Sequence, residues 1–242
     1  MTKSSLLLIL AFLVFNLQAF SQEREKGREK PAKGYLGIAF GPSLVSGNFG
    51  NTDWANDSAG FAKNGYNFTI LEFGFKFIKN FGMTAAIKGA VIPLDVQALA
   101  DGYASEYGGQ FTVKSTRWGY TGFFVGPFLS FPTKYFDFDV KLETGLLMAS
   151  APEMTVSRDN QVAGQQSTVG ASISIMGGVG ARIHLSKKFG LLTSAEYHFS
   201  EPTFQTEIYD TSNNYETYTT SQRITLFNFT FGIVYRLFPG KN

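Results

Sequence analysis

Three side chains near the end of the chain have the types and spacing for hydrolytic chemistry. Glu196, His198 and Ser200 lie at positions i, i+2 and i+4. Alternate residues of a β-strand point to the same face, so a strand here would place all three together. A serine nucleophile, a histidine base and a carboxylate that orients the histidine form the constellation of many acyl hydrolases. The same residues also suit a buried polar network, and the face of the strand that they occupy separates the two hypotheses.

Strand signals recur along the chain, and almost nothing has helical periodicity. They predict about eight strands: Tyr35–Val45, Tyr66–Lys79, Phe81–Leu94, Arg117–Phe131, Phe136–Met148, Val169–Ser186, Phe189–Thr206 and Arg223–Phe238. Their connections alternate between short and long, as in barrels with short periplasmic turns and longer extracellular loops. The predicted fold is therefore all-β: a transmembrane up-and-down antiparallel β-barrel over residues 35–238. Both termini are expected in the periplasm, and the long loops outside the cell.

Side-chain alternation supports this fold. In the terminal segment, Arg223–Phe238, one wall carries Phe227, Phe229 and Phe231, and the opposite wall is polar. The other segments repeat the pattern, except the fourth, which is apolar on both walls and leaves its register open. None of the apolar walls carries a charge, as expected for a lipid-facing surface, where a midplane Lys or Arg costs about 2–4 kcal/mol.

The opposite walls collect the ionisable residues. The predicted inward set is Glu72, Lys76, Lys88, Asp137, Asp139, Lys141, Glu143, Arg182, Glu196 and Arg236, with His184 and His198. The lumen of an eight-stranded barrel is just wide enough for side chains to fill it, and buried charges must be paired. We therefore predict an interior ion-pair network that plugs the barrel. Arg236 is expected to pair with a carboxylate such as Glu72 or Glu196.

The first residues have the pattern of a signal peptide, predicted to cover residues 1–21. Lys3 gives the positive n-region, Leu6–Phe15 the apolar run, and Ala19 and Ser21 the small residues before the cleavage site. Residues 22–34 read as a charged periplasmic lead-in, and residues 239–242 as a short tail.

Composition excludes several functions. A formal net charge of +2 does not favour nucleic acid, and a chain with no cysteine has no disulfide and no thiolate metal site. The loop carboxylates lack the spacing of a calcium loop, and the glycines of residues 177–180 lie within a strand instead of before a helix. The sequence therefore predicts neither a metal nor a cofactor.

The chain resembles the small outer-membrane barrel family that includes OmpX and the barrel domain of OmpA. Besides the topology, the resemblance rests on a C-terminal motif: a polar residue, a glycine, an aromatic residue and an apolar residue. The motif is formed here by Thr230, Gly232, Tyr235 and Leu237, followed by Phe238. The resemblance implies an outer-membrane location, contact with outer-membrane lipid, and recognition of this motif by the barrel-assembly machinery during insertion.

Three functions remain open. The leading hypothesis is a non-enzymatic barrel that serves envelope structure, surface interaction or limited passage of small solutes. The second is an accessory component of an envelope or secretion machine with a protein partner, as for small barrels of the PorT kind. The third is a lipid hydrolase or acyltransferase: outer-membrane lipid hydrolases of the PagL kind also carry a His-x-Ser pair, although here Glu201 and Pro202 follow it.

Overall fold

The computed structural model describes residues 32–159, 161–212 and 214–238. The predicted signal peptide, most of the charged lead-in and the four-residue tail lie outside these residues. Within the described part, no helix is long and apolar enough to cross a membrane.

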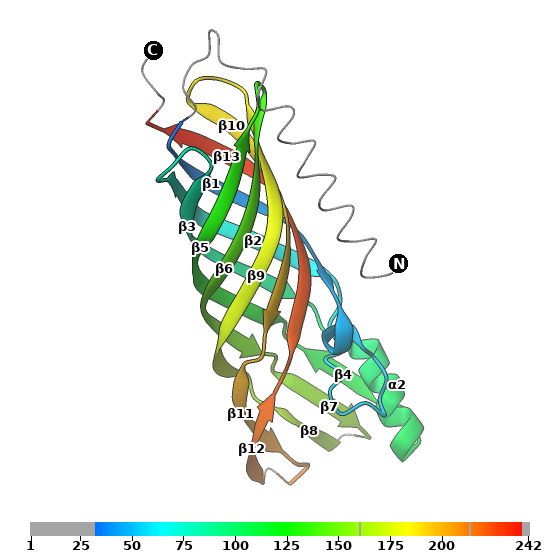
Figure 1. Cartoon of the computed structure of the whole chain (residues 1–242). Helices are drawn as coiled ribbons and strands as arrows, with labels where there is room; N and C mark the ends of the chain where they lie inside the picture. Colours follow the sequence, from blue (N-terminus) through cyan, green and yellow to red (C-terminus); the bar gives the residue numbers. More distant parts are fainter. Residues whose placement is uncertain (1–31, 160, 213, 239–242) are drawn as a thin grey trace, which may run out of the picture.

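Eight antiparallel strands close into a barrel, which confirms the predicted fold (Figure 1). They are β1 (Gly34–Val45), β2 (Gly65–Lys76), β3 (Phe81–Ile92), β5 (Trp118–Pro132), β6 (Phe136–Ala151), β9 (Thr168–His184), β10 (Phe189–Ser200) and β13 (Ile224–Leu237). Each pairs with its neighbour along this series, and β13 returns to pair with β1. Closure leaves none of these eight strands with an unpaired edge, apart from the ends that extend beyond their partners.

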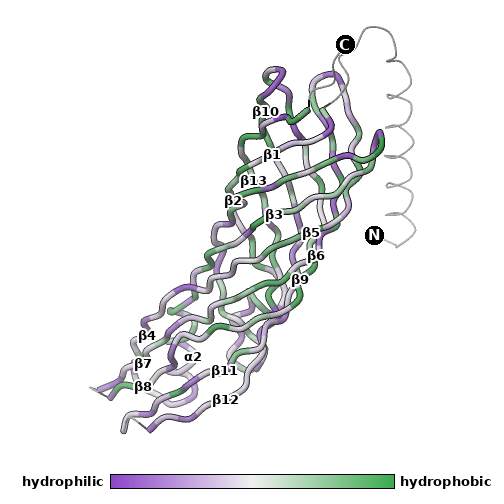
Figure 2. Tube along the Cα trace, turned by 90° about the vertical axis from the view of Figure 1, so that its left-hand side faces the viewer, coloured by the Kyte–Doolittle hydropathy of each residue, from purple (hydrophilic) through white to green (hydrophobic). Residues whose placement is uncertain are grey.

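Burial alternates along the strands as the apolar walls predict. The outer surface of the barrel carries large exposed apolar side chains such as Ile38, Phe40, Leu146 and Ile173. Figure 2 shows the hydropathy alternating along the barrel strands. Contiguous exposed apolar surface of this extent is abnormal for a water-soluble protein and normal for a lipid-facing barrel.

The structure also fixes the register of the fourth segment. In β5, Tyr120, Phe124 and Phe128 point inward and are buried, whereas Phe123 and Leu129 are exposed on the outside. Both walls are apolar because one faces the outside of the barrel and the other packs in its interior.

A β-bulge in β2 adjusts the alternation. Between the pairs that Thr69 and Leu71 make with β3, Ile70 is an extra residue, and both Ile70 and Leu71 are exposed. The extra residue shifts the side-chain alternation by one position. Thr69 before the bulge and Glu72 after it therefore both face the interior.

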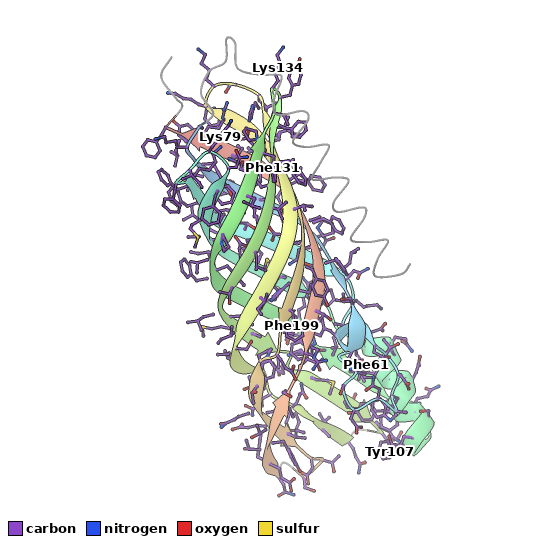
Figure 3. All side chains as sticks on the ribbon, viewed as in Figure 1. Phe61, Lys79, Tyr107, Phe131, Lys134 and Phe199 are labelled. Carbon is purple, nitrogen blue, oxygen red and sulfur yellow. The ribbon has the colours of Figure 1, made fainter. Side chains whose placement is uncertain are left out.

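The barrel has two different ends. At one end, which we call the short-turn end, lie the start of β1, the end of β13 and the three short connections, near Lys79 and Lys134 (Figure 3). The long connections meet at the other end and fold into an ordered cap. Its elements are η1 (Gly47–Gly50), α2 (Val96–Tyr107), β4 (Thr112–Ser115), β7 (Met154–Arg158), β8 (Gln161–Gln165), β11 (Thr203–Tyr209) and β12 (Tyr215–Ser221).

The cap contains a helix, although the sequence shows almost no helical periodicity. Asp95 caps α2 by accepting a hydrogen bond from the Ala98 N–H at 3.1 Å, the side-chain contact that starts a helix in a loop. Phe61, Leu99, Val113 and Val156 form a separate small hydrophobic core under this helix. The predicted seventh segment, Phe189–Thr206, is in fact divided by Glu201 and Pro202, where β10 ends and β11 enters the cap.

Candidate functional site: the barrel interior

Lys88 holds two carboxylates together in the middle of the barrel. Its Nζ lies 2.6 Å from Glu143 Oε2 and 2.8 Å from Glu196 Oε2. The three side chains come from β3, β6 and β10, and each is at most 5% exposed. Glu143 also accepts a hydrogen bond from the Thr84 hydroxyl at 2.7 Å. Fixed donors such as these are what make buried carboxylates tolerable.

A second cation completes the central group. Lys141 pairs with Glu72, and its Nζ lies 3.9 Å from Glu196 Oε1. Glu72 accepts a further hydrogen bond from the Tyr35 hydroxyl at 2.7 Å. We call Glu72, Lys88, Lys141, Glu143 and Glu196 the central ion-pair group. It connects strands β2, β3, β6 and β10 across the lumen.

Another ion-pair group lies toward the short-turn end. Arg182 contacts Asp139 through Nε at 2.7 Å and Nη2 at 2.9 Å, the bidentate geometry that a guanidinium favours. Asp137 lies 3.4 Å from the same guanidinium and 3.3 Å from His184. The Tyr35 ring lies 4.1 Å from the guanidinium carbon of Arg182, and the Tyr35 hydroxyl bonds to Glu72, so Tyr35 links this group to the central ion-pair group.

Two predicted members stand apart from these pairs. Lys76 is 6% exposed and faces the interior, but its Nζ makes no hydrogen bond within the described residues. Arg236 was expected to pair with Glu72 or Glu196, and that prediction is wrong for the part of the chain that the structure describes. Its Nη1 donates to the Ser186 carbonyl at 3.4 Å. Arg236 lies at the rim, too far along the barrel from Glu196, which is opposite Asn228 in the strand register, nearer the middle of β13.

The half of the lumen nearest the cap is filled with apolar side chains, which the charge pattern did not predict. Phe124, Leu147 and Leu226 are buried there in one cluster. Trp118 packs edge-on between Phe49 at 5.7 Å and Phe204 at 5.8 Å, so the cap continues the core over the mouth. The signal in the sequence was the fourth segment, whose second apolar wall supplies Tyr120 and Phe124 to this cluster.

The candidate hydrolytic residues do not form a triad. His198 Nε2 lies 2.7 Å from the hydroxyl of Ser174, and Ser200 Oγ makes no hydrogen bond within the described residues. Glu196 contacts Lys88 instead of orienting the histidine. All three side chains are buried in the interior, and Tyr120 packs edge-on against the His198 ring at 4.7 Å.

The C-terminal motif lies at the seam where β13 closes the barrel. The Thr230 hydroxyl bonds to that of Ser194 at 2.6 Å. Gly232 pairs with Ala39, and a Cβ at this glycine would overlap the Ile38 carbonyl oxygen and come within 2.6 Å of the Ala39 Cα. Tyr235 packs on Phe189 at 5.3 Å, Leu237 pairs with Gly34, and the Phe238 ring lies 6.3 Å from Phe75. These residues therefore make packing contacts in the folded barrel, whether or not the barrel-assembly machinery recognises them.

No cluster of three or more His, Cys, Asp or Glu residues suitable for a metal occurs within the described residues. The barrel interior contains ion pairs, hydrogen bonds and apolar packing. His198 lies there between Tyr120 and Ser174.

Comparison with known proteins places the fold. No family model matches the chain, and no curated protein matches it. Among solved structures, a major outer membrane protein from Thermus thermophilus has a TM-score of 0.53 at 12% identity, covering 85% of this chain and 99% of that one. Ail, the attachment invasion locus protein of Yersinia pestis, has a TM-score of 0.44 at 12% identity over 85% and 98% of the two chains. The fold is that of the small eight-stranded outer-membrane barrels.

Proposed function

We propose that this protein is a non-enzymatic outer-membrane barrel with a closed interior, which presents its folded cap at the cell surface. The observation that carries the proposal is the filling of the lumen. The ion pairs of Arg182 and of the central ion-pair group occupy the half near the short-turn end and the middle. The apolar cluster around Phe124 occupies the rest. A continuous water path for solutes requires a polar, open lumen, which large barrels have and eight-stranded barrels do not.

The proposed orientation places the short-turn end in the periplasm and the cap outside the cell. The uncharged apolar outer wall and the likeness to outer-membrane barrels support the location. The support for the orientation is the difference in length of the connections, since outer-membrane barrels have short periplasmic turns. Outer-membrane lipid would surround the barrel, and the barrel-assembly machinery would read the motif from Thr230 to Phe238 during insertion.

Planar-bilayer conductance of the refolded protein tests the closed interior. The expected result is no steady single-channel current, and large steady channels would overturn the proposal. Location is tested on intact cells by labelling a cysteine introduced at Thr217 of β12 with a membrane-impermeant maleimide. Labelling at Thr217 and none at a cysteine introduced at Lys79 is expected, and the reverse pattern would invert the orientation.

A role as an accessory component of an envelope machine is the second candidate, and the β11–β12 hairpin favours it. All seven residues of β12 are exposed, and among the described strands β12 pairs only with β11. An unpaired strand edge offers backbone hydrogen bonds to another protein. Copurification of one stable partner with the wild-type protein, and its loss when residues 203–221 are removed, would support this role.

A further inference from the structure

A groove of about 430 Å³ crosses the cap away from the barrel lumen. Its floor is one face of strands β7, β8 and β11, where Met154 pairs with Gln165 and Gln165 with Ile208. Its side wall is aromatic and comes from α2 and the segment after it: Tyr103, Tyr107 and Phe111. The ring centroids of Tyr103 and Phe111 are 5.6 Å apart, and those of Tyr103 and Tyr107 6.3 Å apart.

The groove is open to solvent. Tyr107 is 59% exposed and Ile208 40% exposed, while Val156 at the floor is buried. Burial, with Tyr107 and Glu106 nearby, raises the pKa of Tyr103 above its ordinary value, so its phenol is neutral. The aromatic wall is therefore an uncharged, electron-rich surface.

The surroundings of the groove are acidic, although the whole chain carries a small positive charge. The long connections of the cap (residues 46–64, 93–117, 151–168 and 201–223) hold eleven carboxylates and five Lys or Arg. Three of the carboxylates directly adjoin groove residues in sequence: Glu106 beside Tyr107, Asp159 beside Arg158 and Asp210 beside Thr211. Hydrogen bonds from Asn214, and from the Ser212 N–H, lower the pKa of Asp210 below its ordinary value, so this carboxylate stays ionised.

The lining of the groove includes one cationic side chain, and its contacts show how a cation is held there. Among the described residues, Arg158 is the one charged residue in its lining, and its guanidinium lies 5.3 Å from the centre of the Phe111 ring. Its Nη1 donates to the Tyr107 carbonyl at 3.2 Å, and its Nε lies 3.4 Å from Asp159. An aromatic face, a carbonyl and a carboxylate are thus combined around a guanidinium, as in cation–π recognition.

We propose that this groove binds a cationic peptide segment, with an Arg or Lys side chain over the exposed Tyr107 ring and an apolar side chain against Met154 and Ile208. Charge complementarity argues for this occupant, because the acidic surroundings attract cations and repel anions. The proposal rests on the proposed function, since such a peptide reaches the groove only if the cap lies outside the cell.

The test is fluorescence anisotropy with the refolded full chain in nonionic detergent and a labelled peptide of alternating Arg and Trp. Saturable binding is expected, with weaker binding at high salt, because the Debye length falls from about 10 Å at 0.1 M to about 3 Å at 1 M. Tyr107→Ala is expected to weaken binding about 2- to 30-fold, the range of a cation–π contact. Tyr107→Phe keeps the ring and is expected to retain binding, which separates loss of the contact from loss of the fold.

Tyr218→Ala is the matched control, because Tyr218 is a half-exposed tyrosine of the same cap outside the groove lining. It is expected to bind like wild type. Asp159→Asn together with Asp210→Asn is expected to reduce both the affinity and its salt dependence. The proposal is overturned if a Glu–Trp peptide binds equally well, if maltohexaose displaces the cationic peptide, or if Tyr107→Ala has no more effect than Tyr218→Ala. These outcomes concern the purified protein alone, so they are independent of the conductance and labelling results.

Discussion

Removing the cation that joins two buried carboxylates is the sharpest test of the central ion-pair group. In Lys88→Met, Glu143 and Glu196 lose contacts of 2.6 Å and 2.8 Å at side chains that are 1% and 4% exposed. Methionine keeps most of the aliphatic volume, so the cost comes mainly from the uncompensated charges. Breaking a buried pair in this way typically costs about 3–5 kcal/mol. We expect the upper part of that range, because Glu196 loses its one hydrogen bond shorter than 3.5 Å within the described residues, whereas Glu143 keeps Thr84.

Urea titration of the refolded protein in vesicles, followed by tryptophan fluorescence, measures this loss as a lower unfolding midpoint at unchanged slope. Lys79→Met is the matched control, because Lys79 is exposed in the β2–β3 turn and its replacement is expected to change stability by less than about 0.5 kcal/mol. Adding Glu143→Gln and Glu196→Gln to Lys88→Met removes the uncompensated charges and should recover most of the loss. A single-variant cost below about 1 kcal/mol, typical of exposed pairs, would refute the electrostatic reasoning.

The remaining predictions concern other parts of the chain. Phe124→Ala empties a fully buried site in the apolar half of the lumen and should cost about 3–5 kcal/mol in the same titration, whereas a cost under about 1 kcal/mol would mean that the site collapses freely. Gly232→Ala should impair refolding in detergent without any assembly factor, seen as loss of the heat-dependent shift on a gel, because its methyl group overlaps the Ile38 carbonyl; normal refolding would contradict the close approach at this seam. Asp95→Ala should destabilise the start of α2 by about 1 kcal/mol and speed protease cleavage in residues 96–107, and unchanged cleavage would argue against a stabilising role of the Asp95 hydrogen bond to the Ala98 N–H. Ser200→Ala should leave outer-membrane lipid composition unchanged in cells, and an altered profile would revive the hydrolase hypothesis.

The sequence predicted the barrel because period-2 alternation is a local property. A strand must place successive side chains on opposite faces, so the apolar residues Phe227, Phe229 and Phe231 define an outer wall without any knowledge of the neighbours. The same rule gave the inward position of Lys88, Lys141 and Arg182. The one segment that it could not orient, Arg117–Phe131, is the one that is apolar both on the outer wall and in the interior.

The sequence could not predict which charged residues pair with each other or where some of the elements begin and end. Whether Lys88 meets Glu143 or Glu72 depends on the stagger of β3 against β6, and alternation carries no information about stagger. Arg236 has the inward parity, but the rim position fixed by the pairing of Tyr35 with Arg236 leads it to the Ser186 carbonyl instead of a carboxylate. The helix α2 was missed because its stability comes from contacts with Trp54, Phe61 and Val156, which are distant in sequence.

The sequence by itself therefore determined which faces of the strands are apolar, which side chains are ionisable, and the alternation of short and long connections. Only the tertiary structure decided that apolar side chains fill the cap-side half of the lumen and that the long connections form a cap with its own core and an acidic, aromatic groove. The physical reason is the range of the interactions. Alternation acts between neighbours in the chain, whereas ion pairs such as Lys88 with Glu196 and clusters such as Phe49, Trp118 and Phe204 form only after strand register brings distant residues together.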